Sequence, residues 1–229
     1  MNSLLLAATL FLASPDLGTG RDTPSIPASG PETRPPNPLG TMRVGEHVPL
    51  GEEVFDLKEA TFMTSPLGAM AHQPHKKLKV AVHSTAFRWI SDVIQAITFW
   101  NATANRELFV LMTDFPERKG VTVDTVLVLV ASDEVINVVL DGIVPPGAQA
   151  AATRLSMNTI TGELANTVVL FPFQRFEDTA TTTARHEFGH VLGLDHDTNE
   201  DSLMAVWSGG KSILSFTDFM AIRLVYGQE

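Results

Sequence analysis

The order of apolar and polar residues predicts alternating strands and helices from residue 77 onward. Residues 78–82 alternate as a short strand. A long helix is expected next, with Ser84 or Thr85 as its N-cap, because apolar residues then recur at intervals of three and four. These apolar positions, which should face the core, are Phe87, Ile90, Val93, Ile94, Ile97 and Trp100.

Four further strands are expected between this helix and a second helix. Residues 108–113 and 123–132 form two of them, and the second is so continuously apolar that both of its faces should be covered. Residues 150–157 alternate, residues 158–162 contain a turn, and residues 163–171 return as another strand. Residues 133–149 are predicted as a loop, and Asp178 or Thr179 should cap the second helix.

The first 76 residues differ in composition and fall into three segments. Residues 1–20 are predicted as an export segment, because the apolar run at 4–13 is about as long as a signal-peptide core. No Lys or Arg precedes that run, so an apolar tail is the alternative. Residues 21–41 are a Pro-rich linker. Residues 42–76 are a remnant prodomain, an extra layer on the main domain or a processed segment, and the main domain is expected at 77–229.

Composition limits the partners of this chain. Its 229 residues are 44% hydrophobic, which is enough for one substantial core. A formal net charge of -10 disfavours nucleic acid, because a phosphate-binding surface needs clustered Lys and Arg. With no cysteine, the chain has neither disulfides nor Cys-ligated metals. No stretch is long enough for a stable membrane span, and no feature predicts an oligomeric state.

One motif carries most of the chemical information. His186, Glu187, His190, Gly193 and His196 spell H-E-x-x-H-x-x-G-x-x-H. On a helix, His186 and His190 project from the same face and can bind one metal ion. Gly193 allows the backbone to leave the helix through a left-handed conformation, which returns His196 to the same ion.

Three imidazoles leave one tetrahedral position of a zinc ion open, which points to bound water and catalysis. Glu187 lies beside that position and is the natural group to take a proton from the water. The alternative is a helix whose histidines are merely buried, but each imidazole would then need a separate polar partner. The sequence therefore predicts one catalytic zinc with His186, His190 and His196 as ligands.

This run resembles the zinc signature of the metzincin peptidases, whose members have a methionine-containing turn below the metal. Residues 201–204 follow His196 at a spacing similar to that of the matrixin branch, which makes Met204 an apolar floor and not a ligand. Residues 214–227 also resemble the last helix of a matrixin catalytic domain. The resemblance covers roughly residues 77–227.

The departures from related families are equally specific. No tyrosine follows Met204, which disfavours the astacin-like and serralysin-like branches. Without a cysteine, latency through a propeptide thiolate on the zinc is excluded. Residues 133–149 hold no histidine for a structural zinc. Carboxylates can bind calcium, but no D-x-D-x-D-G loop is present and no calcium site is assigned.

The resemblance implies an α/β (α+β) fold: a twisted, mostly parallel five-stranded sheet with one antiparallel edge strand, a long helix, an active-site helix and a small C-terminal subdomain ending in a helix. Residues 150–157 are the candidate edge strand, along which an extended peptide would bind as an added strand. A substrate pocket beside the zinc would be lined by Thr182, Thr183, Val206 and Trp207. None of these is charged, so the pocket should prefer an apolar side chain.

Three functions follow from these patterns. The favoured one is an exported zinc endopeptidase that hydrolyses peptide or protein substrates. A zinc-bearing pseudoenzyme or peptide-binding module without turnover is the second, and the intact Glu187 counts against it. The third is a metal-free interaction protein in which the motif is accidental.

Overall fold

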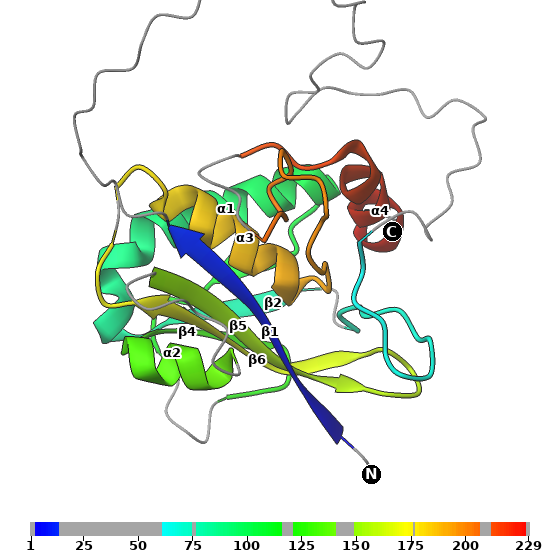
Figure 1. Ribbon diagram of the computed structural model, residues 1–229, viewed down its shortest axis with the longest axis horizontal. Coiled ribbons are helices and arrows are strands. Elements are labelled where there is room, and N and C mark those ends of the chain that lie inside the picture. The colour runs from blue at the N-terminus through cyan, green and yellow to red at the C-terminus, as the bar shows by residue number, and fades with distance from the viewer. Residues whose placement is uncertain are drawn as a thin grey trace, which may run out of the picture.

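A computed structural model describes residues 3–13, 61–74, 77–115, 121–140, 149–175, 177–206 and 212–227, with only the backbone given for 3–13. The elements are shown in Figure 1. In chain order they are β1 (Ser3–Ala13), β2 (Leu78–Val82), the 3-10 helix η2 (Ser84–Trp89), α1 (Ile90–Ala104), β3 (Phe109–Leu111), β4 (Thr125–Ala131), α2 (Asp133–Val139), β5 (Gln149–Asn158), β6 (Leu164–Pro172), α3 (Ala180–Val191) and α4 (Phe216–Tyr226).

The sheet has the strand order β1-β5-β6-β4-β2-β3. Strands β2, β3, β4 and β6 are parallel, and β5 runs antiparallel to β6, as predicted. The five predicted strands are therefore present, and their one antiparallel strand, β5, is the outermost of the five. β1 adds a sixth strand on the outer side of β5. β1 pairs antiparallel with β5 from Ser3 opposite Asn158 to Ala13 opposite Gln149. The apolar run 4–13 thus lies along the outer side of β5 (Figure 1).

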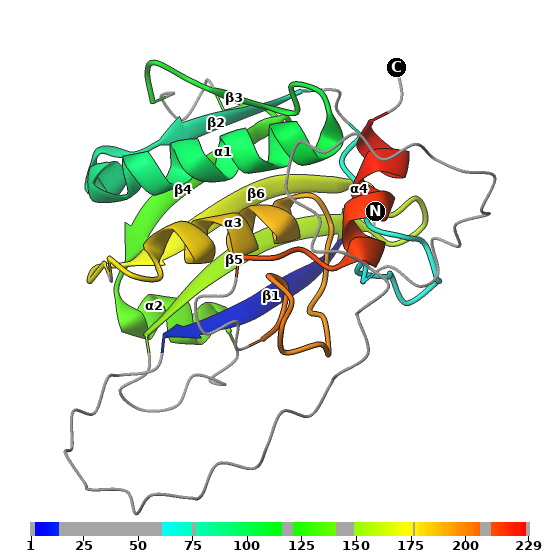
Figure 2. The same ribbon diagram turned by 90° about the horizontal axis from the view of Figure 1, so that it is seen from above.

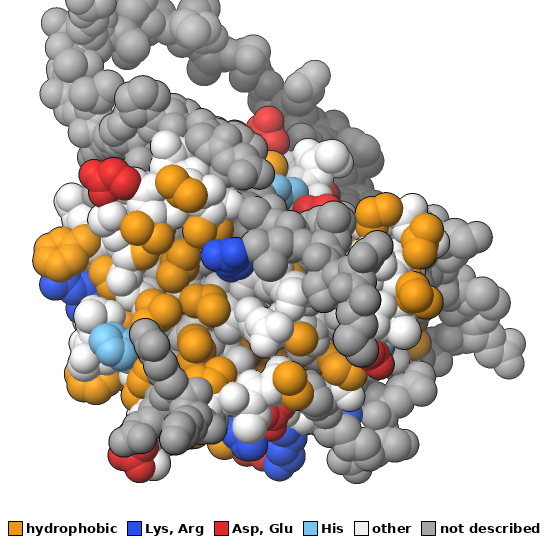
Figure 3. Space-filling view, turned by 90° about the horizontal axis from the view of Figure 1, so that it is seen from below, with side chains coloured by type: hydrophobic (Ala, Val, Ile, Leu, Met, Phe, Trp, Pro, Cys, Tyr) orange, Lys and Arg blue, Asp and Glu red, His pale blue; other side chains and the backbone are white. Residues whose placement is uncertain are grey.

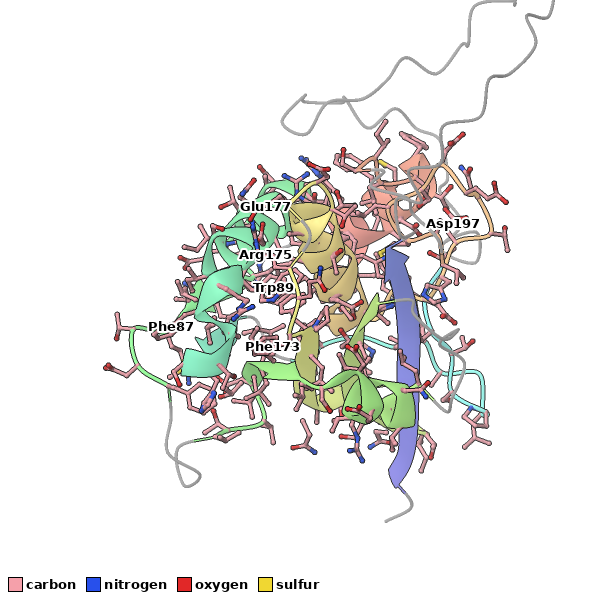
Figure 4. The ribbon with its side chains drawn as sticks, turned by 60° about the vertical axis from the view of Figure 1, so that its left-hand side comes forward. Phe87, Trp89, Phe173, Arg175, Glu177 and Asp197 are labelled. Carbon is pink, nitrogen blue, oxygen red and sulfur yellow. The ribbon has the colours of Figure 1, made fainter. Side chains whose placement is uncertain are left out.

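Helices α1 and α3 lie side by side on one face of the sheet (Figure 2). Their buried side chains form the main core with β2, β4 and β6. The ring of Trp89 stacks on that of Phe171, with centroids 4.3 Å apart, which fixes the start of α1 against β6. Asp92 of α1 is buried and accepts hydrogen bonds from Arg175 and Thr181, so the start of α3 is tied to α1. Arg175 also pairs with Glu177, and both residues are labelled in Figure 4.

The predicted apolar stripe of the long helix is only partly correct. Val93, Ile97 and Trp100 are buried, but Phe87 is 61% exposed and Ile94 is 45% exposed. Residues 84–89 form a 3-10 helix, which has three residues per turn. Phe87 is therefore out of phase with the stripe. The predicted N-caps, Ser84 and Thr85, were also wrong. The N-cap of η2 is His83, whose side chain accepts a hydrogen bond from the Thr85 amide.

The segment predicted as a loop at 133–149 contains a two-turn helix, α2. It packs on the opposite face of the sheet from α1 and α3, where Ile136 and Leu140 contact buried residues of β5 and β6. β4 is only partly covered on this side, because Leu127 and Leu129 are half-buried. Figure 3 shows hydrophobic side chains gathered on this side of the molecule.

Residues 61–74 pack against the end of α3, within the segment predicted as an extension at 42–76. The Met63 amide donates to the Gly193 carbonyl, and the Leu164 amide donates to the His72 carbonyl. Helix α4 lies against α1, where the Arg223 side chain donates to the Thr103 carbonyl. In the part of the chain that the structure describes, no helix is long and apolar enough to cross a membrane.

Candidate metal and catalytic site

Helix α3 places two histidines and a glutamate in the interior. His186, Glu187 and His190 are each 0% exposed, although the helix is rich in polar residues. Its N-cap is Thr179, one of the two residues predicted for that position, but the Thr179 side chain makes no cap hydrogen bond. The two histidines are four residues apart, so their rings meet on one helix face with centroids 4.7 Å apart.

Backbone carbonyls determine which ring nitrogen of each helical histidine carries the proton. His186 Nδ1 lies 2.8 Å from the Leu203 carbonyl, and His190 Nδ1 lies 2.7 Å from the Leu194 carbonyl. A carbonyl only accepts, so each Nδ1 is the donor and each Nε2 of a neutral ring carries a lone pair. The two Nε2 atoms are 3.0 Å apart. Two facing lone pairs at this distance repel, and a cation between them removes the repulsion.

His196 completes the group from the loop after α3. The ligating atoms of His186, His190 and His196 all lie within 4.8 Å of one another. His196 Nε2 is buried and has no hydrogen-bond partner among the described residues. Burial lowers the pKa of His196 to about 3 and lowers the pKa values of the other two histidines as well. All three rings are thus held neutral, which is the form that binds metals.

Glu187 lies beside this group and has two unequal oxygens. Oε2 accepts a hydrogen bond of 2.7 Å from the Thr153 hydroxyl on β5. Oε1 is buried and has no hydrogen-bond partner in the described structure. Burial raises the pKa of Glu187 to about 8, and the Thr153 hydrogen bond opposes this shift. Burial therefore disfavours the charged form of this carboxyl group.

The predicted methionine turn lies directly under α3. Met204 is fully buried, and a Cβ atom at Gly189 would be only 2.5 Å from the Met204 Sδ. The Met204 amide donates to the Ser202 hydroxyl, and the Met204 carbonyl accepts from the Asp197 amide. Figure 4 labels Asp197 on this loop, away from Phe87 and Phe173. The turn thus joins the chain after His196 to the floor of the histidine group.

Gly193 makes the turn that brings His196 back. Its φ is +98°, in the left-handed region that favours glycine, as predicted from the motif. A Cβ atom there would lie 2.6 Å from the Ala71 carbonyl oxygen. The segment at 61–74 therefore packs directly on this turn.

The four predicted pocket residues have different outcomes. Thr182 and Thr183 are buried on α3, and the Thr183 hydroxyl donates to the Thr179 carbonyl. Val206 is half-buried after the methionine turn, and Trp207 lies outside the described residues. The pocket itself stays a prediction.

The groups that hold the site in place could not be predicted from the sequence. The carbonyls of Leu194 and Leu203 have no sequence signal, because every residue has a carbonyl. Thr153 has a weak signal, since it carries the one hydroxyl among the buried residues of β5 that the structure describes. The other buried residues of this strand are Ala150, Ala151, Ala152, Leu155 and Met157.

Comparison with known proteins agrees with this geometry. No curated protein matches the chain. A sequence model of the matrixin family of peptidases matches residues 68–227, which is more than half of the chain. Matrixins are zinc-dependent metallopeptidases, whose substrates are peptides or proteins. The match spans the histidine group, the methionine turn and the last helix, and the chain belongs to the matrixin family.

Proposed function

We propose that this protein is an exported zinc endopeptidase in which His186, His190 and His196 hold one catalytic zinc and Glu187 is the general base. The observation that carries the proposal is the convergence of three neutral imidazoles beside a buried carboxyl group with one unpartnered oxygen. The donor set fits zinc, which three histidines commonly bind with one position left open.

When bound, the zinc would supply a Lewis acid at the open side of the three imidazoles. Glu187 Oε1 takes a proton from the attacking water, whose oxygen bonds to the carbonyl carbon of the peptide. The carbon–nitrogen bond then breaks, and Glu187 returns the proton to the leaving amine. No side-chain nucleophile is required, and the chain has no cysteine to provide one.

The substrate would bind as an extended strand along β5. Support comes from β1, which pairs antiparallel with this side of β5 over most of its length. The backbone groups on this side of β5 can therefore accept an added strand. Residues 1–20 are also the proposed export segment, and their removal during export would leave this side open to a peptide.

The residue after the scissile bond would enter a pocket lined by Thr182, Thr183, Val206 and Trp207. Because none of these side chains is charged, an acidic or basic side chain would lose its hydration without compensation. We expect broad preference for Leu, Ile, Met and Phe, since one methylene discriminates by only about 1–3 kcal/mol. Cleavage sites read by mass spectrometry check this, and enrichment of charged residues after the cut would contradict it.

The deciding experiment is the variant Glu187→Gln, which keeps the shape of the side chain and removes its basicity. The zinc-loaded wild type should cleave a denatured-protein mixture, and a chelator should abolish the cleavage. Glu187→Gln should keep zinc and lose at least about a hundredfold in turnover, the usual scale for a general base. His190→Ala is the matched control, because it should lose zinc as well as activity. Zinc-loaded wild type that cleaves nothing would instead favour a peptide-binding module.

A further inference from the structure

Thr153 is a buried hydroxyl on the strand that borders the proposed substrate cleft. It is 0% exposed, and the other buried residues of β5 are all apolar, namely Ala150, Ala151, Ala152, Leu155 and Met157. A hydroxyl buried among apolar side chains needs a hydrogen-bond partner. Both of its partners belong to one residue, since it lies 2.7 Å from Glu187 Oε2 and 3.0 Å from the Glu187 carbonyl oxygen.

This arrangement holds one carboxyl oxygen and leaves the other available. With Oε2 bound by Thr153, rotation of the Glu187 carboxyl group is restricted, and Oε1 keeps a single orientation. One contact of the hydroxyl is with the Glu187 side chain and the other is with its backbone carbonyl, so both parts of this residue are tied to β5.

The backbone of Thr153 connects this contact to the strand that receives the peptide. On one side Thr153 is opposite Val169 of β6, and on the other it is opposite Ala8 of β1. The side chain of Thr153 therefore contacts Glu187, and its backbone lies opposite the strand that pairs with the outer side of β5. A shift of β5 would move both together.

We propose that Thr153 is a positioning residue, which orients Glu187 toward the reacting water and sets its place relative to the bound peptide. This proposal rests on the proposed peptidase function. It assigns Thr153 no contact with the reacting atoms. Its effect is on the rate of the chemical step and not on the binding of substrate or metal.

The kinetic test compares Thr153→Val with Thr153→Ser. The Val variant replaces the hydroxyl by a methyl group of similar size and should lower kcat by about tenfold or more, because the base is no longer held. KM should change by less than about twofold and the zinc content should stay that of wild type. Thr153→Ser keeps the hydroxyl and should restore most of kcat.

Thr103→Val is the matched control. Thr103 is also 0% exposed, and its hydroxyl donates to the Phe99 carbonyl on α1. Thr103→Val should lose about as much stability as Thr153→Val but keep the kcat of wild type. If Thr153→Val keeps wild-type kcat, or if Thr153→Ser is as slow as Thr153→Val, the proposal is overturned.

A structural measurement separates this proposal from the peptidase function. Crystal structures of wild type and Thr153→Val, both loaded with zinc, report the position of the Glu187 carboxyl group without turnover. We expect one carboxyl orientation in wild type and a displaced or multiple orientation in the variant. An unmoved carboxyl group would overturn the positioning role even in an active enzyme. If wild type cleaves nothing, the peptidase function fails while this measurement still decides the role of Thr153.

Discussion

Replacing Gly193 by alanine tests whether the turn after α3 assembles the metal site. Gly193 has φ +98°, and an alanine there costs about 1–2 kcal/mol from the left-handed conformation alone. The added Cβ would also lie 2.6 Å from the Ala71 carbonyl oxygen, which is backbone and cannot rotate away. Overpacking of this kind costs about 1–3 kcal/mol. The expected loss in the free energy of unfolding is therefore about 2–5 kcal/mol.

Gly68 provides the matched control for this substitution. Its φ is +81°, but a Cβ atom there would meet nothing within 4 Å. Gly68→Ala should therefore show only the conformational cost, about 1–2 kcal/mol, and keep normal zinc affinity. Gly193→Ala should also weaken zinc binding by about 10- to 100-fold, because His196 is displaced. Urea unfolding and competition with a chelator measure both quantities. Equal losses in the two variants would refute the role of the Ala71 contact.

Three further outcomes follow from contacts around the site. Tyr226→Phe should lower the free energy of unfolding by about 1–3 kcal/mol, because it leaves the buried Leu192 carbonyl and Gln73 amide without their partner; urea unfolding measures it. A chain that starts at Met42 loses the β1–β5 pairing but should still fold and bind zinc, whereas a chain that starts at residue 77 should unfold, because it also lacks the contacts of residues 61–74 with the Gly193 turn; circular dichroism and zinc content measure both. Zinc at about a hundred times its Kd should stabilise wild type by about 2.7 kcal/mol relative to the chelated protein, as measured by thermal unfolding. In His190→Ala zinc should have no such effect.

Most of the sheet could be predicted because its strands show a clear pattern. The boundaries 78–82 of β2 agree with the structure, since an alternating segment is bounded there by polar residues. The antiparallel direction of β5 was also predicted, from the resemblance to a known family. In contrast, α2 is only seven residues long and rich in β-branched residues, so its helical period is too short to recognise. Packing on the sheet stabilises it, which is a tertiary effect.

The candidate site was also only partly predictable from the sequence. The three histidines could be found because ligands for one ion must occur at fixed spacing on a helix. Phe87 was expected in the core and is exposed, because the sequence gives no sign of where the 3-10 geometry of η2 changes to the α-helical geometry of α1. Thr153 is 34 positions from Glu187 in the chain, so its contact depends on how β5 lies under α3.

The contacts that orient the histidines explain why a short motif is not sufficient to make this site. His186 and His190 are held by carbonyls of Leu203 and Leu194, so substitution of either leucine side chain does not remove the acceptor. The orientation of the histidines instead depends on the course of the backbone in the loop after α3. That course depends on Gly193 and on the backbone hydrogen bond between Asp197 and Met204. It also depends on residues 61–74, which precede the motif by more than a hundred positions and pack on the Gly193 turn. The five motif residues transplanted to another helix would therefore place two imidazoles correctly, but neither their tautomers nor His196 would be fixed.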